Sequence, residues 1–431
     1  MFAFGDLIQF VFARTLPETA KFQVDETTDK NMKNTLVSIF LLGTITLLAL
    51  PAHGQKTKPP GFNELQIGDK APEFDLKGID DQQWTLDKFS DKKLLVVYFT
   101  SNHCPVCHAH DPRLVSLVKE LDGKEVAFVA INPNSGDGLR IDELGYSKYD
   151  DSFEDMKPYA KDHGFTFPYL YDGETQKTAK AYGCLATPHM FIFDQDRKLQ
   201  YRGRLDNSRY TDPKTVKTQD ARNAIMELLA GKAVTVPITK PFGCSTKWLE
   251  KISAVTKDND NWKSAKVTLD DINADQLAAL VKNDTQKYRL FNVWSTSCVP
   301  CIEEFPGLMS VSRRMGLRNF ELITVSTDLP EDHKRVLAFL SKHRAVLHKK
   351  LKPTLKAEGR KSNNYLYQGA DMDSLIKALD SKWEGPQPHS ILVAPGGEVV
   401  FRHNGKIEEA DLLDALLKVM TTTYQPKPAK K

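Results

Sequence analysis

The chain has 431 residues, and at about 100–200 residues per domain this length predicts two or three domains. Hydrophobic residues make up 41% and charged residues 27%, which excludes an intrinsically disordered chain. The 59 Lys and Arg residues against 56 Asp and Glu residues leave a formal charge of +3, which does not support nucleic-acid binding, because nucleic-acid binders usually carry a basic excess. A mean hydropathy of −0.41 excludes a polytopic membrane protein. Six cysteines are too few for a disulfide scaffold, so their chemistry depends on where they lie.

The N-terminal region carries the pattern of an export signal. Lys33 precedes an apolar run at residues 36–50, and small residues at 52–54 resemble a cleavage site. The run has 15 residues, fewer than the ~20 that a membrane-spanning helix needs, although an uncleaved anchor is the alternative. Met32 is an alternative start of translation. We therefore leave residues 1–54 out of the fold and expect a periplasmic or other extracytoplasmic protein, whose thiols meet oxidising conditions.

The remaining chain repeats one pattern twice. Each copy contains a nearly continuous apolar run typical of a strand buried on both faces, at residues 93–100 and 288–294. Each run leads into a Cys-x-x-Cys pair and then into a helical pattern. The pairs are Cys104 with Cys107, and Cys298 with Cys301. Eight residues after each first cysteine stands a proline, Pro112 or Pro306. Proline inside a helix costs about 3 kcal/mol, so its presence at the same place in both copies indicates a shared structure.

The repetition continues toward the end of each copy. Thr187-Pro188-His189 and Gln387-Pro388-His389 each open a strand-like run, which is followed by a turn and an amphipathic helix, at residues 221–230 and 409–420. The two copies therefore predict one α/β unit used twice.

These residues resemble the thioredoxin superfamily. The second half resembles the TlpA/ResA type of extracytoplasmic thiol-disulfide oxidoreductase, whose motif is N-x-W-x-x-x-C-x-P-C-x-x-E-x-P. The matching residues are Asn292, Trp294, Cys298, Pro300, Cys301, Glu304 and Pro306. The first half resembles the peroxiredoxin-like (AhpC/TSA-like) branch through IGDKAPEFDL at its start, SNHCP at the cysteines and GCSTKW at its end.

The resemblance implies two tandem thioredoxin-fold domains, each with a central mixed β-sheet flanked by helices, after the signal peptide. The expected segments are a linker at 55–65, the first domain at 66–248, a second linker at 249–265, the second domain at 266–423 and a polar tail at 424–431.

Thiol–disulfide exchange requires a thiolate, although a free cysteine has a pKa near 8.5. A helix N-terminus favours the anion, so Cys104 and Cys298 are the expected nucleophiles. Cys107 and Cys301, one turn further on, are the expected resolving thiols. No cofactor and no metal are expected, because the cysteines carry the electrons themselves.

By resemblance, Pro188 and Pro388 are cis prolines that face the sulfurs, and X-Pro is the only bond type in which the cis form carries a small penalty. The backbone of Thr187 or Gln387 would then pair with an extended substrate segment.

Two further residues have supporting roles in the family pattern. Glu304 matches a position linked to proton handling, and a solvated helix glutamate is the alternative. Trp294 is a supporting residue or a simple core residue. The two pairs differ internally, Cys-Pro-Val-Cys against Cys-Val-Pro-Cys, which is consistent with an electron relay between the domains.

The sequence thus predicts an exported thiol-disulfide oxidoreductase whose partners are protein thiols or disulfides and an upstream reductant. It predicts no nucleic-acid partner, and membrane contact only through an uncleaved signal peptide.

Four other readings compete. A Cys₄ zinc site is disfavoured because 194 positions separate Cys107 from Cys301. Cys-Pro-Val-Cys-His satisfies the haem c attachment signature, but it lies at a strand-to-helix junction shared with the second half. Copper or zinc held by histidines around Cys104 is a related possibility, with thiolate and imidazole as ligands. The candidate ligands are His103, Cys104, Cys107, His108 and His110.

A thiol peroxidase is the fourth reading. Ser101 stands three residues before Cys104, as in the peroxiredoxin S/T-x-x-C motif. Val97 replaces the proline of that family, and Pro188 falls where its arginine would align, so peroxide reduction is the alternative function.

Two cysteines and one basic segment remain. Cys184 and Cys244 either form a structural disulfide, worth about 2–4 kcal/mol, or are buried small side chains. Residues 333–361 hold ten Lys or Arg and one acidic residue, Glu358. This segment is a solvated face or a docking surface for an acidic partner, and residues 328–384 are expected to contain added helices.

Overall fold

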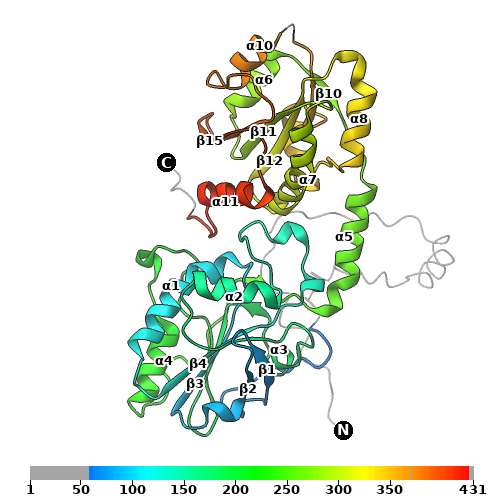
Figure 1. Ribbon diagram of the computed structural model, residues 1–431. Coiled ribbons are helices and arrows are strands. Elements are labelled where there is room, and N and C mark those ends of the chain that lie inside the picture. Colours follow the sequence, from blue (N-terminus) through cyan, green and yellow to red (C-terminus); the bar gives the residue numbers. More distant parts are fainter. Residues whose placement is uncertain (1–57, 370, 427–431) are drawn as a thin grey trace, which may run out of the picture. The chain divides into compact units, whose positions relative to one another are not determined.

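The computed structural model describes residues 58–369 and 371–426 (Figure 1). The predicted signal peptide at 1–54, the alternative start at Met32 and the end of the polar tail lie outside the described residues. Within them, two separate mixed sheets form, one in each half of the chain.

The first sheet has the strand order β2-β1-β5-β4-β3-β7-β8. Strand β4 pairs in parallel with β3 and β5, and the other pairs are antiparallel. The strands are β1 (Asp75–Gly78), β2 (Gln83–Thr85), β3 (Leu94–Phe99), β4 (Val126–Asn132), β5 (Tyr169–Tyr171), β7 (His189–Phe193) and β8 (Leu199–Gly203). The helices of this half are α1 (Pro105–Glu120), α2 (Phe153–Asp162), α3 (Lys177–Tyr182) and α4 (Asp220–Leu229).

Strand β3 is the centre of this half, and all six of its side chains are buried. Because side chains alternate along a strand, Leu95, Val97 and Phe99 face the core that includes α3, whereas Leu94, Val96 and Tyr98 face α1, α2 and α4. The apolar run therefore forms a strand covered on both faces.

The second sheet has the order β10-β13-β12-β11-β14-β15, parallel from β10 to β11 and antiparallel beyond. Its strands are β10 (Asp270–Ile272), β11 (Tyr288–Trp294), β12 (Phe320–Ser326), β13 (Asn364–Tyr367), β14 (His389–Val393) and β15 (Val399–Asn404). Its helices are α6 (Ala274–Lys282), α7 (Val299–Arg314), α8 (His333–Lys342), α9 (Lys352–Ala357), α10 (Met372–Leu379) and α11 (Glu409–Met420).

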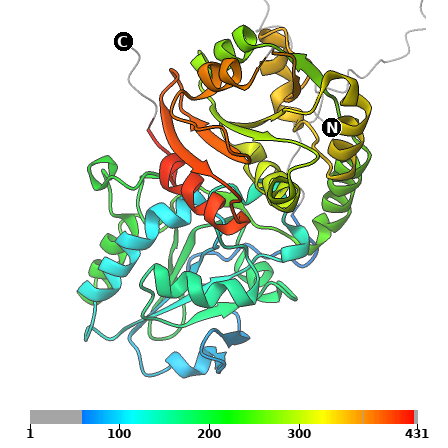
Figure 2. The same ribbon diagram turned by 45° about the horizontal axis from the view of Figure 1, so that its top comes forward.

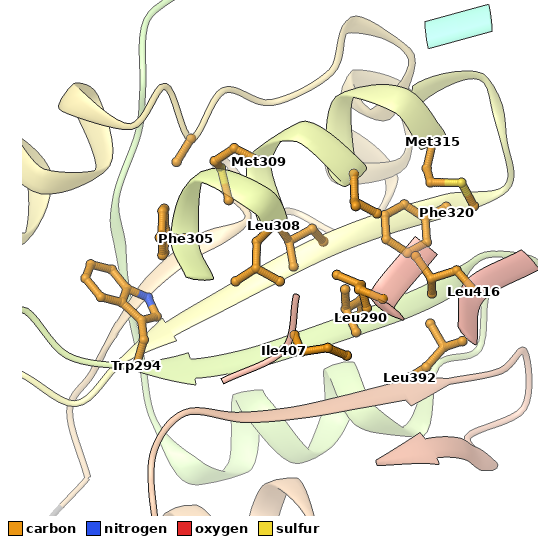
Figure 3. Close-up of a cluster of buried hydrophobic side chains, with 14 of the residues drawn as sticks. Leu290, Trp294, Phe305, Leu308, Met309, Met315, Phe320, Leu392, Ile407 and Leu416 are labelled. Carbon is orange, nitrogen blue, oxygen red and sulfur yellow. The ribbon is translucent and has the colours of Figure 1, made fainter. Parts of the chain in front are cut away.

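Strand β11 has the same two-sided burial. One face packs against α7, α8 and α11, and the other packs against α6 and α10. Helices α7 and α11 lie side by side (Figure 2). Figure 3 shows the first of these cores, with Trp294 at the end of β11 near Phe305 of α7. These arrangements confirm the α/β class with central mixed sheets flanked by helices.

Two segments between the main strands are helical. The predicted linker at 249–265 consists of a 3-10 turn (Leu249–Lys251) followed by α5 (Ile252–Ser264). This segment has no Gly or Pro to interrupt a helix. Residues 328–384 contain helices α8, α9 and α10, together with β13.

A small separate sheet pairs β6 (Ala186–Thr187) with β9 (Cys244–Ser245). Among the described residues, no helix has both the length and the apolar character required to cross a bilayer.

Candidate active site

The two Cys-x-x-Cys pairs occupy equivalent places in their halves. Cys104 is the N-cap of α1 and Cys298 is the N-cap of α7, with a proline in the first turn of each helix. Phe99 at the end of β3 lies opposite His189, and Val293 near the end of β11 lies opposite His389. In each half the first cysteine comes five residues after that paired position, so the same register brings the X-Pro segment to the cysteine loop.

The Thr187–Pro188 and Gln387–Pro388 peptide bonds are both cis, as the resemblance predicts. In the first half the contact with sulfur is direct. The Cys104 thiol lies within hydrogen-bond distance of the Thr187 carbonyl oxygen, at 3.3 Å. Thr187 therefore borders the reactive sulfur.

An aspartate that follows the neighbouring strand along the chain supports the cysteine loop in both halves: Asp151 lies just before α2, and Asp328 lies two residues after β12. Asp151 accepts a hydrogen bond from the backbone N–H of Asn102 at 2.7 Å, and Asp328 accepts one from the N–H of Thr296 at 2.9 Å. Asn102 and Thr296 each stand two residues before the first cysteine. This repeated aspartate was not predicted from the sequence, because the two residues follow strands β4 and β12 at different distances and lie in no recognisable motif.

In the first half a histidine adds to this support. His103 Nδ1 lies 2.5 Å from Asp151 Oδ2, and both side chains are buried. Burial tends to raise the pKa of Asp151, but the adjacent His103 and the hydrogen bonds to the carboxylate outweigh it and lower that pKa. The equivalent residue before Cys298 is Ser297, which is exposed.

The thiols of the first pair are both fully buried. Burial tends to raise the pKa of Cys104, but hydrogen bonds from the Cys107 and Cys244 thiols, the nearby His103 and the Cys107 N–H lower it well below its usual range. Burial raises the pKa of Cys107 far above that range, and the neighbouring Cys104 adds to the effect. This ordering fits Cys104 as the nucleophile and Cys107 as the resolving thiol.

Cys244 lies at this site and not in a structural disulfide. All four cysteines of the first half are free thiols. Cys184 is fully buried, with its thiol 3.3 Å from the Ala186 carbonyl oxygen. Cys244 packs against Cys104 and Cys107 instead. Of the two alternatives for these cysteines, the structure does not show the Cys184–Cys244 disulfide, because β9 places Cys244 opposite Thr187, and Cys184 is a buried small side chain.

The second pair is arranged more openly. Cys298 and Cys301 form a disulfide with a Cα–Cα distance of 5.2 Å. Cys298 is half-buried, Cys301 is buried and Val299 between them is 64% exposed. Gln387 is half-buried, and its side-chain amide donates to Thr327 Oγ1 at 2.8 Å. No strand within the described ranges pairs with Gln387, so the edge beside the cis proline is open.

Glu304 and Trp294 both lie inside the second half. Glu304 is 3% exposed and accepts hydrogen bonds from Asn292 Nδ2 at 2.8 Å and from the Ile407 N–H at 2.9 Å. The solvated-helix alternative for Glu304 was wrong, and burial raises the pKa of its carboxyl. Trp294 is fully buried, with its ring centroid 4.9 Å from Phe305 and 4.7 Å from Phe339. It forms the end of the core that lies beneath the cysteine helix.

The histidines around Cys104 point to different partners. His103 faces Asp151, whereas His108 Nε2 lies 2.7 Å from the Asn102 carbonyl oxygen and His110 Nε2 lies 2.8 Å from that of Ser208. In the part of the chain that the structure describes, no cluster of three or more His, Cys, Asp or Glu side chains is arranged to hold a metal ion. Thioether attachment of a haem does not fit two fully buried sulfurs with His108 already engaged.

The hydroxyl expected of a peroxidase does not reach Cys104. Ser101 Oγ bonds Thr187 Oγ1 at 2.8 Å and lies 3.7 Å from the sulfur of Cys107. This geometry does not favour Cys104 as a peroxidatic cysteine.

The basic segment at 333–361 is partly paired. Arg335 contacts Asp328 at 3.0 Å, and Arg360 contacts Glu321 at 3.0 Å. Part of its charge therefore belongs to ion pairs with acidic residues, and its use as a docking surface stays a prediction.

Comparison with known proteins finds a family match within the first half. Residues 67–202 match the model of the AhpC/TSA family. A thioredoxin-like protein of Bacillus subtilis (strain 168), YneN, is 27% identical over 137 residues, which cover 32% of this chain and 70% of that protein.

Among solved structures, an uncharacterized conserved protein from Geobacillus kaustophilus is 38% identical, with 43% of this chain and 94% of that chain covered and a TM-score of 0.39. A hypothetical protein from Sinorhizobium meliloti 1021 is 33% identical, with 43% and 96% covered and a TM-score of 0.39.

Proposed function

We propose that the chain, as a redox enzyme of the thioredoxin type, exchanges disulfides with protein partners through both Cys-x-x-Cys pairs. The premise is membership of the thioredoxin superfamily, with an AhpC/TSA family domain at residues 67–202. The second pair is the site at which we place the main exchange with large protein substrates. The single observation that carries this proposal is the half-exposed Cys298 at the N-terminus of α7, beside an X-Pro edge that is free of any described strand.

The proposed exchange follows from the position of the two sulfurs. The N–H groups at the start of α7 favour a thiolate at Cys298, and the Cys301 N–H already donates to its sulfur at 3.3 Å. The Cys298 thiolate attacks a partner disulfide, forming a mixed disulfide and releasing one partner thiolate. The Cys301 thiol then loses its proton and attacks the Cys298 sulfur. The partner leaves as a dithiol, and the Cys298–Cys301 disulfide remains.

The substrate in this proposal is an extended segment that pairs with the backbone of Gln387. Edge strands offer unpaired N–H and C=O groups, which bind an extended chain with little regard to its sequence. Recognition through the backbone suits an enzyme that acts on several proteins. An upstream thiol reductant would return the disulfide to the dithiol form.

Export of the protein is part of the same proposal. It rests on the charged, apolar and small-residue regions at 33–54. In an extracytoplasmic compartment, protein disulfides are abundant substrates.

Reduction of insulin by the full chain with dithiothreitol tests the proposal. We expect Cys298→Ser to lower the rate by about tenfold or more, because thiolate attack is the first chemical step. The double variant with Cys104→Ser should be inactive, and Cys184→Ser, a buried thiol away from both pairs, is the matched control. Full activity in the double variant would overturn the proposal.

A further inference from the structure

Strand β9 occupies the edge of the first site at which a substrate segment would bind. Its Cys244 lies opposite Thr187, the residue before the cis proline, and Ser245 lies opposite Ala186. The contact extends to Thr246, whose N–H donates to the Leu185 carbonyl at 3.2 Å. In the first half, the chain thus places its own antiparallel strand at the edge beside Thr187. The equivalent edge beside Gln387 in the second half stays open.

The fit of this strand against the cis proline is close. A Cβ atom at Gly243 would lie 2.0 Å from the Thr187 carbonyl oxygen and 2.9 Å from Pro188 Cδ, with the backbone at a φ of +153°. Only glycine suits both the space and the backbone conformation. The following Lys247 is buried, and its ammonium group lies 2.7 Å from Glu143. These contacts anchor both ends of β9.

Cys244 stands where the cysteine of a bound substrate would stand. Its side chain packs against Cys104 and Cys107, and Cys104 also contacts the Thr187 carbonyl to which Cys244 is opposed. The Cys104 interaction raises the pKa of Cys244, and burial adds to it. A thiol that donates to the Cys104 sulfur also stabilises the Cys104 thiolate. Cys107 and Cys244 thus both border the Cys104 sulfur.

We propose that β9 is a tethered occupant of the substrate edge, and that Cys244 is a third redox cysteine, which exchanges with the Cys104–Cys107 disulfide to form a Cys104–Cys244 disulfide. This inference rests on the proposed function, since it needs Cys104 to undergo disulfide exchange. In the step, the Cys244 thiol gives up its proton and its sulfur bonds to Cys104. The Cys104–Cys107 bond breaks, and the Cys107 thiolate takes up a proton, so the number of disulfides is unchanged.

The consequence is regulation of the first site. With Cys104 bonded to Cys244, the nucleophile is blocked and β9 is held covalently across the edge. A partner dithiol that reduces this bond frees Cys104, and local release of β9 then exposes the edge to a substrate.

Disulfide mapping of the full chain tests the inference. A Cys107→Ser variant is incubated with oxidised glutathione, trapped with N-ethylmaleimide at acidic pH, digested and analysed by mass spectrometry. Cys104 attacks glutathione disulfide, and Cys244 then displaces glutathione. We expect most Cys104 to be linked to Cys244, with the same result when Cys184→Ser is added. Stable Cys104–glutathione adducts with Cys244 alkylated would overturn the inference.

Disulfide mapping of the oxidised wild-type chain distinguishes a failure of this inference from a failure of the proposed function. A Cys104–Cys107 disulfide without any Cys104–Cys244 species in either protein would overturn this inference and leave the proposed function standing. Cys104 that forms a disulfide with no partner at all would overturn both.

A Gly243→Ala variant tests the role of β9 through access to Cys104. We expect alkylation of reduced Cys104 by iodoacetamide to be faster by about tenfold, because weakening β9 by about 1.4 kcal/mol multiplies the open population tenfold. An unchanged rate in a folded variant would contradict the tethered occupant. If this variant fails to fold, Cys244→Ser in the Cys107→Ser background replaces it as the test. The Cys104–Cys244 disulfide must then be absent, and Cys104–glutathione adducts must accumulate.

Discussion

The two Cys-x-x-Cys sites share their spacing, their helix start, their cis proline and their supporting aspartate, yet one is closed and the other open. Cys104 is fully buried beneath β9, whereas Cys298 is half-buried beside an exposed Val299. The difference does not come from the cysteine motif itself. A segment that includes β9 contributes to the cover: its Phe242 and Cys244, 138 and 140 positions after Cys104, pack against the first pair. A repeated scaffold can therefore present or cover the same nucleophile through one short segment.

The sites also differ in the charges around the first sulfur. The first has a buried His103–Asp151 pair next to Cys104, whereas in the second Asp328 pairs with Arg335 and Ser297 stands in the histidine position. The first site thus combines a strongly stabilised thiolate with poor access. The second relies on the helix terminus and has better access. Reactivity toward a protein substrate requires both properties.

Chemical labelling gives the largest expected contrast between the sites. In the reduced full chain, we expect Cys298 to react with iodoacetamide about a hundredfold faster than Cys104 at neutral pH, because a buried thiol reacts only when the local structure opens. Mass spectrometry of timed samples measures both rates in one experiment. Cys184 serves as a buried reference, and labelling in urea should equalise the rates. Equal rates under native conditions would remove the distinction between a closed and an open site.

Exchanging the residue before each first cysteine addresses the charge difference. His103→Gln removes the imidazole that contacts Asp151 next to Cys104, and we expect the pKa of Cys104 to rise, because His103 is one of the groups that lower it. The converse change, Ser297→His, should lower the pKa of Cys298 by less, because that position is exposed and solvent screens the charge.

Absorbance of the thiolate near 240 nm, followed against pH, measures both shifts. Asp150→Asn, next to Asp151 but not bonded to His103, is the control for the first half. The same pKa for Cys104 in His103→Gln and in the wild type would show that the histidine does not affect the pKa of this thiol.

The smallest expected effect is on the pH dependence of the free energy of unfolding, through one equivalent position of helices α1 and α7. Six residues after the first cysteine, α1 carries His110 and α7 carries Glu304, both buried. Burial raises the pKa of Glu304 in the folded state, so its contribution to stability is full below its unfolded pKa and is lost as pH rises through the folded value. Burial lowers the pKa of His110, so its contribution is present above its unfolded pKa and is lost as pH falls.

Urea unfolding midpoints at pH 4, 5.5 and 7 check these opposite signs. We expect Glu304→Gln to flatten the loss of stability between pH 4 and pH 7, and His110→Gln to flatten the loss below about pH 6.5, the usual value for histidine. Glu303→Gln is the matched control, because Glu303 is the exposed neighbour of Glu304. The same slope in Glu304→Gln and wild type would contradict a raised pKa for this carboxyl.

Much of this site was predictable because it depends on local sequence. The cysteine spacing, the X-Pro pairs and the apolar runs are short-range patterns, and the structure places them at the same register in both halves. The supporting aspartates were not predictable, because Asp151 comes 47 positions after Cys104 and Asp328 comes 30 positions after Cys298. The parallel pairing of β11 with β12 brings Asp328 to its cysteine loop, whereas Asp151 reaches Asn102 from the loop that precedes α2.

By itself, the amino-acid sequence determined the repeated α/β unit, the two central buried strands and the positions of the two cysteine pairs, since periodicity and motif spacing act over a few residues. The tertiary structure decided which sulfur is covered, which carboxyl is buried and where Cys244 lies. Burial and long-range strand pairing depend on segments distant in the chain, and Gly243 allows one of them to pack against the first cis proline. The same motif therefore gives a closed site in one half and an open site in the other.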